Sequence, residues 1–306
     1  MRAKVIFLVG PTATGKSELG IKLASRIKGE IISCDSMQVY KGMEILSAVL
    51  PPVLRKKIRH HLVSYVSPKY EYNVVKFQRD AIKILKDIIK RGKIPIFIGG
   101  SGLYYKVLLD GIFTQQTHDK RLREKLYKEA KAYSSYFLYE KLKRIDPQSS
   151  AKIHPHDLKR IIRAIEVYEK TGIPISTWQK RTKGIINEYD VRIFGLLRSK
   201  DVIFKRIQER TERMFRAGVV EEIKRLLRVK LSKTAQQAVG IKEISGYLNS
   251  LYPLEEAKRL IVSNTLKLVK KQLTWFKRDK RINWINIRDN QTDDEVIKII
   301  LDEIKN

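Results

Sequence analysis

The sequence predicts an α/β fold in which a parallel sheet is flanked by helices and a small all-helical insertion interrupts the chain. Short apolar runs rich in β-branched residues alternate with segments whose apolar residues recur at helical spacing. This alternation implies right-handed crossover connections and therefore a parallel sheet. A central stretch carries almost no strand signal, and strand character returns after it.

The first strand and the first helix flank the most informative motif. Residues 5–9 read Val-Ile-Phe-Leu-Val, which is typical of a buried strand, and Leu19, Leu23 and Ile27 follow at helical spacing. The segment between them matches G-x-x-x-x-G-K-[ST], the phosphate-binding loop or P-loop, so the fold class is P-loop NTPase-like. Its backbone N–H groups and a helix N-terminus surround an anion, its lysine reaches the outer phosphates, and its last hydroxyl holds Mg²⁺. The sequence therefore predicts a site for a diphosphate or triphosphate, with Ser17 as the magnesium ligand. The loop residues are Gly10, Pro11, Thr12, Ala13, Thr14, Gly15, Lys16 and Ser17.

Two further strands and a helix follow in the N-terminal part. We expect strands over residues 30–34 and 94–98, and between them a helix over 74–91 that ends at Gly92. The first of these strands ends at Asp35. The second ends at a Gly-Gly-Ser-Gly segment containing Ser101, which opens another helix. Because ligands of parallel sheets lie at the carboxyl ends of the strands, we expect Asp35 and Ser101 near the P-loop.

The central stretch predicts a basic, all-helical insertion. Residues 118–183 hold 17 Lys and Arg against 8 Asp and Glu. Asp157 is a good N-cap for a helix over residues 158–170, which Gly172 would end. We expect an insertion domain over residues 116–189 and a catalytic core made of residues 1–115 and 190–306.

The C-terminal part returns to the sheet and then becomes helical. Residues 191–197 predict a strand that rejoins the sheet. Helices are expected over residues 201–215, 219–228, 241–248 and 253–277, a last strand over 282–287, and a closing helix over 293–304.

Composition and charge narrow the function classes. The 306 residues include 63 Lys and Arg against 33 Asp and Glu, a net charge of +30, which favours a polyanionic partner such as nucleic acid. The alternative is a set of merely solvated lysines. The single cysteine, Cys34, excludes disulfides and cysteine-based zinc sites, and no apolar stretch approaches the ~18 residues of a membrane span. Residues 1–4 leave no room for a signal peptide before the first strand, so we expect a cytoplasmic protein without membrane association. Nothing demands a dimer, and a monomer is expected.

Several side chains are candidates for chemistry. Asp35 is a candidate general base or magnesium ligand, or it caps the following turn. Arg210 or Arg213, near the end of a predicted helix, would stabilise a leaving diphosphate, or both lie on a solvated face. No apolar strand ends in a second metal-binding Asp, which weakens the interpretation as a motor-type NTPase.

Three pairs of side chains could be taken for a metal site or a base-stacking site, but the sequence favours a structural role for each. His60-His61 favours local hydrogen bonding over a metal site, because adjacent histidines do not share a helix face. The same holds for His154 and His156. Trp275 and Phe276 close a basic helix, where they would stack on bases or, as the safer interpretation, pack in the core.

Taken together, these segments resemble one family, the tRNA dimethylallyltransferases (tRNA isopentenyltransferases, the IPP transferase family). The resemblance extends from the P-loop to about Lys280. Besides the P-loop it rests on an ordered set of segments: Asp35-Ser36-Met37-Gln38-Val39-Tyr40, His60-His61-Leu62, Gly99-Gly100-Ser101-Gly102-Leu103-Tyr104, Arg160-Ile161-Ile162-Arg163-Ala164-Ile165-Glu166, Gln237-Ala238-Val239-Gly240-Ile241-Lys242-Glu243 and Lys271-Gln272-Leu273-Thr274-Trp275-Phe276.

The resemblance implies a reaction. The dimethylallyl group of dimethylallyl diphosphate moves to N6 of adenosine 37 in tRNAs that read codons beginning with U, and diphosphate is released with Mg²⁺ as cofactor. Asp35 matches the family base, Arg210 the arginine that contacts the diphosphate, and Ser101 stands where the family usually has Thr.

The resemblance also implies a set of positions that contact the tRNA anticodon stem-loop with its A36-A37-A38 sequence. The helical insertion would grip the stem of that RNA. The implied contact positions are Asp35, Ser36, Met37, Gln38, Ser101, Arg123, Lys159, Arg160, Ile161, Ile162, Arg163, Gln237, Ala238, Val239, Gly240, Ile241 and Lys242.

Two other functions fit the P-loop. A small-molecule or nucleoside kinase would fill the loop with ATP and use Asp35 on a substrate hydroxyl, but it leaves the +30 charge unexplained. A non-catalytic RNA-binding NTPase would bind RNA tightly and lose nothing when Asp35 is changed to Asn.

Overall fold

The computed structural model describes residues 2–113 and 117–305, which form two compact units. The first unit comprises Met1–Leu109 and Ile185–Asn306, and the second comprises Asp110–Gly184. The second unit thus begins and ends a few residues earlier than the expected range 116–189.

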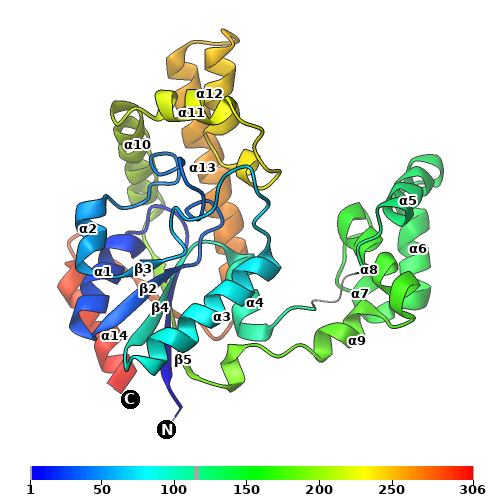
Figure 1. The fold of residues 1–306 in the computed structure, drawn as a ribbon, viewed down its shortest axis with the longest axis horizontal. Coiled ribbons are helices and arrows are strands. Elements are labelled where there is room, and N and C mark those ends of the chain that lie inside the picture. Colours follow the sequence, from blue (N-terminus) through cyan, green and yellow to red (C-terminus); the bar gives the residue numbers. More distant parts are fainter. Residues whose placement is uncertain (1, 114–116, 306) are drawn as a thin grey trace. The chain divides into compact units, whose positions relative to one another are not determined.

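The first unit is built on a six-stranded, wholly parallel sheet with the strand order β3-β2-β4-β1-β5-β6 (Figure 1). The mixed α/β fold with a parallel sheet is therefore confirmed. The strands are β1 (Lys4–Val9), β2 (Gly29–Ser33), β3 (His60–His61), β4 (Ile94–Gly99), β5 (Asp190–Leu197) and β6 (Asn283–Asn286). All except β3 were expected, and β3 is two residues long, too short to leave a periodic signal.

Helices cover both faces of this sheet, and the alternation of side chains along β1 explains why. Phe7 joins a core with α3 (Val74–Lys90) and α4 (Gly102–Asp110). Its neighbours Ile6 and Leu8 join a second core with α1 (Lys16–Arg26) and α14 (Asp293–Lys305). Successive residues of a strand point to opposite faces, so a strand buried on both sides reads as a continuous apolar run.

The remaining helices of the first unit lie at the carboxyl end of the sheet or connect its parts. Figure 1 shows α13 in orange beside the olive α10, with α11 and α12 in yellow beyond them. The bounds of these elements are α2 (Pro52–Lys57), η1 (Ile185–Asn187), α10 (Lys200–Arg216), α11 (Val219–Leu227), η2 (Ala235–Gln237), α12 (Ile241–Leu248) and α13 (Leu254–Phe276).

The described residues of the second unit, 110–113 and 117–184, form helices joined by turns and contain no strand. Its core includes Leu126, Leu138 and Ile165. Asp157 accepts a hydrogen bond from the Arg160 N–H and caps α8, and Gly172 ends that helix with φ 66°, as predicted. Its helices are α5 (Lys120–Tyr133), α6 (Ser135–Ile145), α7 (Pro147–Ser150), α8 (Leu158–Thr171) and α9 (Ile175–Lys180).

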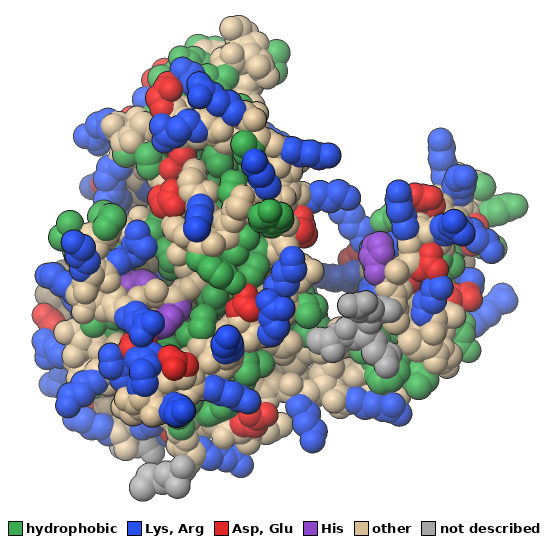
Figure 2. Space-filling view, in the orientation of Figure 1, with side chains coloured by type: hydrophobic (Ala, Val, Ile, Leu, Met, Phe, Trp, Pro, Cys, Tyr) green, Lys and Arg blue, Asp and Glu red, His purple; other side chains and the backbone are tan. Residues whose placement is uncertain are grey.

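Two properties of the described surface bear on function. Figure 2 shows Lys and Arg side chains spread over the visible face of both units. Among residues 2–113 and 117–305, no helix combines the length and the apolar character needed to cross a membrane.

Candidate active site

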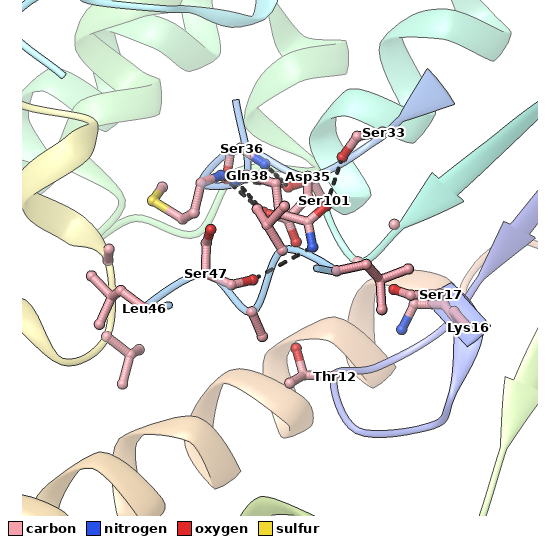
Figure 3. Close-up of a pocket in the computed structure, with 18 of the residues that line it drawn as sticks. Thr12, Lys16, Ser17, Ser33, Asp35, Ser36, Gln38, Leu46, Ser47 and Ser101 are labelled. Carbon is pink, nitrogen blue, oxygen red and sulfur yellow. Dashed lines mark hydrogen bonds between the residues drawn. The ribbon is translucent and has the colours of Figure 1, made fainter. Parts of the chain in front are cut away.

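A cavity of about 1510 Å³ opens in the first unit at the carboxyl ends of β1, β2 and β4. The P-loop, the segment after β2 and the segment after β4 line it, as the position of strand ends in a parallel sheet predicts. Helices α10 and α13 contribute the remaining wall. Figure 3 shows Lys16 and Ser17 on one side of this space and Asp35, Ser36 and Ser101 on another.

The P-loop holds a buried lysine. Gly10 and Gly15 have φ values of 137° and 93°, and a Cβ on Gly10 would lie 2.6 Å from the Leu196 carbonyl oxygen, so only glycine fits there. The Lys16 Nζ donates to the Pro11 carbonyl at 2.5 Å. Burial lowers the pKa of Lys16 to about 7, a shift that the nearby Asp35 carboxylate opposes and the Arg210 guanidinium reinforces. Such a lysine gains its proton most readily when an anion occupies the loop.

Arginines of α10 face the P-loop. Arg210 and Arg213 both line the cavity, and burial lowers the pKa of Arg210 while the Asp35 carboxylate raises it. Arg206, one helical turn earlier, also lines the cavity, and its guanidinium lies 3.5 Å from the position that a Cβ on Gly15 would occupy. Sequence reasoning missed Arg206, although its spacing of four residues from Arg210 puts both on one helix face.

Just before α10, Arg198 supports the loop from another direction. Its Nε donates to the Thr14 carbonyl at 3.1 Å. This residue was also missed, because the contact joins positions 184 residues apart and has no local pattern.

The segment after β2 forms a tight polar wall. One carboxylate oxygen of Asp35 accepts hydrogen bonds from the N–H groups of Met37 at 2.8 Å and Gln38 at 3.4 Å. Asp35 therefore does cap its own turn, and it also lines the cavity. The Ser101 Oγ accepts from the Ser36 N–H at 3.1 Å and lies 3.2 Å from the Ser36 Oγ. Neighbouring polar groups thus hold the side chains of both Asp35 and Ser101 in place.

The Gln38 amide is held between two groups of the first unit. Its Oε1 accepts from the Ser33 Oγ at 3.0 Å, and its Nε2 donates to the Ser47 carbonyl at 3.4 Å (Figure 3). A fixed amide presents a defined donor and acceptor pattern to a ligand in the cavity.

Gln272 joins the two halves of the cavity wall. Its Oε1 accepts from the Thr12 N–H at 2.8 Å, and its Nε2 donates to the Gly100 carbonyl at 3.1 Å. The side chain is buried, so these two hydrogen bonds satisfy polar groups that bulk water does not reach. Sequence reasoning included Gln272 only as part of a matching motif and gave it no role.

The expected RNA-contact positions of the first unit are only partly accessible. Gln237 and Lys242 are exposed, whereas Ala238 and Ile241 are buried in the core. Gly240 has φ 110°, and its N–H donates to the Glu243 carboxylate at 2.8 Å, which caps α12.

The helical unit divides its expected contact positions in the same way. Lys159 and Arg160 are exposed, whereas Ile161 and Ile162 pack in the core of the unit. Arg123 and Arg163 both bind the fully buried Glu166 carboxylate, with Nε–Oε1 and NH1–Oε2 distances of 2.7 and 2.6 Å. These two arginines therefore have a structural partner, and only part of each guanidinium faces solvent.

The structure shows the surroundings of His60 and His61 and of the aromatic pair Trp275 and Phe276. His61 Nε2 lies 2.8 Å from Glu30 Oε2, and His60 Nδ1 lies 2.7 Å from the Ile58 carbonyl, so local hydrogen bonding is confirmed. Within residues 2–113 and 117–305, no group of three or more His, Cys, Asp and Glu is placed to hold a metal. Phe276 is buried as expected, but Trp275 lines the cavity and is 40% exposed, so core packing is wrong for this residue.

Comparisons with known proteins show which family the chain resembles. The family model described as IPP transferase matches residues 38–279. The tRNA dimethylallyltransferase of Carboxydothermus hydrogenoformans is 46% identical, with 94% of this chain and 93% of the relative covered. That of Halothermothrix orenii is 42% identical, with 92% and 87% covered.

Solved structures give the same picture. The tRNA isopentenylpyrophosphate transferase of Bacillus halodurans has a TM-score of 0.72 at 32% identity, with 99% of this chain and 97% of that chain covered. A eukaryotic dimethylallyltransferase acting on tRNA has a TM-score of 0.84 at 29% identity, with 99% and 80% covered.

Proposed function

The chain belongs to the IPP transferase family and its activity is that of a tRNA dimethylallyltransferase, and we propose that it transfers the dimethylallyl group of dimethylallyl diphosphate to N6 of adenosine 37. The observation that carries this proposal is the single cavity shared by the P-loop and by Asp35 and Ser101. A diphosphate on the loop and an adenine beside Asp35 would meet within it. The named relatives favour this reaction over the kinase alternative.

The donor side of the cavity suits a departing diphosphate. Lys16, Arg206 and Arg210 converge there from the P-loop and α10. As the bond between the allylic carbon and oxygen breaks, negative charge grows on the diphosphate, and cations held beside it stabilise that charge. The Ser17 hydroxyl lies in the same loop and, with the diphosphate oxygens and water, fits the sparse protein coordination of Mg²⁺, which would supply further charge stabilisation.

The acceptor side suits an adenine that has left the RNA stack. Asp35 would take the proton that the exocyclic amine loses on attack, while its bonds to the Met37 and Gln38 N–H groups keep it in place. The Ser101 Oγ would hydrogen-bond the same base. Because the cavity is recessed, the target nucleotide would have to flip out of the anticodon loop to enter it.

The charge of the helical unit supports an RNA partner. Its exposed Lys159 and Arg160 lie on the first turn of α8, and α5 and α6 carry further lysines. Lysines and arginines on one small unit supply sequence-independent affinity for phosphates. We assign this unit to the stem that carries the anticodon loop.

Diphosphate release is the direct test. Wild-type protein is mixed with dimethylallyl diphosphate and Mg²⁺, with and without an unmodified tRNA that contains A36-A37-A38. Release that requires this tRNA, with a matching mass gain on the RNA, is the expected result. ADP formed from ATP without RNA would instead indicate a kinase, and a control RNA with guanosine at position 37 should give no release.

A further inference from the structure

Trp275 is a large aromatic side chain left half open at the active-site cavity. It is 40% exposed and lines the cavity, whereas its neighbour Phe276 is 1% exposed and packs edge-on against Tyr105. A tryptophan that is partly exposed at the edge of a ligand cavity offers an aromatic face to whatever binds there.

The fold builds a specific seat for this ring. A Cβ on Gly102 would lie 2.9 to 3.0 Å from the Trp275 atoms Cγ, Cβ and Cδ2, so the missing side chain lets the indole lie against the first turn of α4. Gly102 directly follows Ser101, the residue expected to contact the target adenine. The ring is therefore fixed at the acceptor side.

The geometry of α13 separates the ring from the diphosphate. Gln272 lies three residues before Trp275 on the same helix and bonds to the P-loop through the Thr12 N–H and to the Gly100 carbonyl. Along α13 the order is thus the P-loop contact first and then the indole beside Gly102. Lys271, also at the cavity and exposed, offers a cation for a phosphate near the ring.

From this arrangement we propose that Trp275 is a nucleobase-stacking site for the nucleotide next to the flipped adenosine. This proposal rests on the proposed function. When one base enters the cavity past Ser101, its neighbour loses a stacking partner and stays at the mouth. An aromatic ring there replaces that partner with a contact that every base can make.

The test uses stem-loop RNAs in which A36 or A38 is replaced by 2-aminopurine, without the prenyl donor so that no transfer occurs. The fluorescence of this base falls when it stacks on an indole. Trp275→Phe keeps an aromatic face, whereas Trp275→Leu keeps apolar packing against Gly102 but has none. We expect bound RNA to be quenched by the wild type and by Trp275→Phe at one of the two positions, and to be at least twofold brighter with Trp275→Leu.

Kinetics give a second readout. In Trp275→Leu, loss of one base–aromatic stack corresponds to a roughly 5- to 150-fold rise in KM for RNA, with KM for dimethylallyl diphosphate unchanged. Tyr70→Leu is the matched control, because Tyr70 is 67% exposed and is not among the residues that line the cavity. Melting temperatures of all variants show whether they fold.

The outcomes separate this inference from the proposed function. Equal brightness of wild type and Trp275→Leu at both positions, with equal KM for RNA, would overturn the stacking site. Absence of prenyl transfer by the wild type in the same preparations would instead count against the proposed function.

Discussion

Gln272 accepts a hydrogen bond from the Thr12 backbone N–H at 2.8 Å and so ties α13 to the phosphate-binding loop. The same amide donates to the Gly100 carbonyl, next to Ser101. One buried side chain therefore sets the spacing between the donor and acceptor sides of the cavity.

Replacing Gln272 should loosen both sides at once. Gln272→Leu has a similar volume but leaves the Thr12 N–H and the Gly100 carbonyl without their partner, which costs about 1–3 kcal/mol for each buried group. We expect a lower melting temperature and weaker diphosphate binding, measured by calorimetry. Thr274→Val is the control, because Thr274 lies on the same helix but is exposed and is not among the residues that line the cavity. Unchanged diphosphate affinity in Gln272→Leu would show that the loop holds its shape alone.

Asp35→Asn should separate binding from turnover. Asparagine retains the Oδ1 acceptor for the Met37 and Gln38 N–H groups, so the turn is preserved, but it does not take a proton from the substrate amine. We expect turnover to fall ~10²–10⁴-fold while the affinities for RNA and diphosphate stay within a few-fold. Wild-type turnover in this variant would remove Asp35 from the mechanism.

Lys16 should make diphosphate binding depend on pH. Its pKa is lowered to about 7 in the folded protein, so at pH 8 most molecules hold this amine neutral. A bound diphosphate favours the charged form, and binding at pH 8 should therefore take up close to one proton, falling toward zero below pH 6. Calorimetry in buffers with different ionisation enthalpies measures this uptake. The Lys16→Met variant should take up fewer protons on diphosphate binding at pH 8, by close to one. Identical proton uptake by the two proteins would show that Lys16 is not the group that gains the proton.

The same shift has a consequence for stability. The unfolded chain binds a proton at Lys16 up to about pH 10, while the folded chain releases it near pH 7. Between these values the unfolded state carries more protons, so the Lys16 contribution makes the folded state more stable as pH rises. Denaturant unfolding of wild type against Lys16→Met should show this difference in slope from pH 7 to 9, and parallel curves would contradict it.

Arg163 and Arg160 form a matched pair for the helical unit. Arg163 binds the buried Glu166 and the Thr117 Oγ1, whereas Arg160 is exposed and lies 3.4 Å from Asp157. Arg163→Ala should raise KM for RNA more than KM for dimethylallyl diphosphate and also destabilise the unit by about 1–3 kcal/mol. Arg160→Ala should weaken RNA binding with little effect on melting. If Arg163→Ala affects both KM values equally, an RNA-binding role for this unit fails.

Gly99 should tolerate no side chain. A Cβ there would lie 2.0 Å from the Cys34 carbonyl oxygen and 2.3 Å from its carbonyl carbon, so β2 and β4 would have to part at the edge of the cavity. We expect Gly99→Ala to fold poorly or not at all, as judged by soluble yield and melting temperature. A Cβ on Gly92 would meet no atom within 4 Å, although the φ there is 68°. Gly92→Ala should therefore lower the free energy of unfolding by only about 1 kcal/mol. Equal stability of the two variants would contradict this account.

The sequence predicted most of the sheet because its strands are buried on both faces and read as unbroken apolar runs. The match at Ile241–Leu248 is complete, and most other ends agree within one or two residues. The two-residue β3 and the short α2 left no periodic signal. Helices α5 and α6 were covered only by the expectation of a helical insertion, because exposed lysines and tyrosines obscure their apolar stripe.

The site was predictable where a local motif carries it and was missed where distant segments meet. The P-loop has its own pattern, and strand ends pointed to Asp35 and Ser101. Arg198 reaches the loop from the segment before α10, Arg206 from α10 itself and Gln272 from α13. These positions depend on tertiary packing. The burial of Ile161 and Ile162 likewise follows from the face that α8 turns to its own core, which a motif match does not reveal.

The way the chain enters and leaves the helical unit has a further consequence. The Thr182 Oγ1 donates to the Asp110 carbonyl at 3.0 Å, and a Cβ on Gly111 would meet the Lys183 backbone at 2.6 Å. The first and last residues of the unit are therefore clasped together, and a short bridge across them would close the gap at little entropic cost. The unit also has an apolar core of its own. Substitutions inside it therefore need not disturb the packing of the sheet. If the unit contacts RNA as proposed, substitutions within it can change the affinity for RNA while the P-loop and Asp35 stay the same.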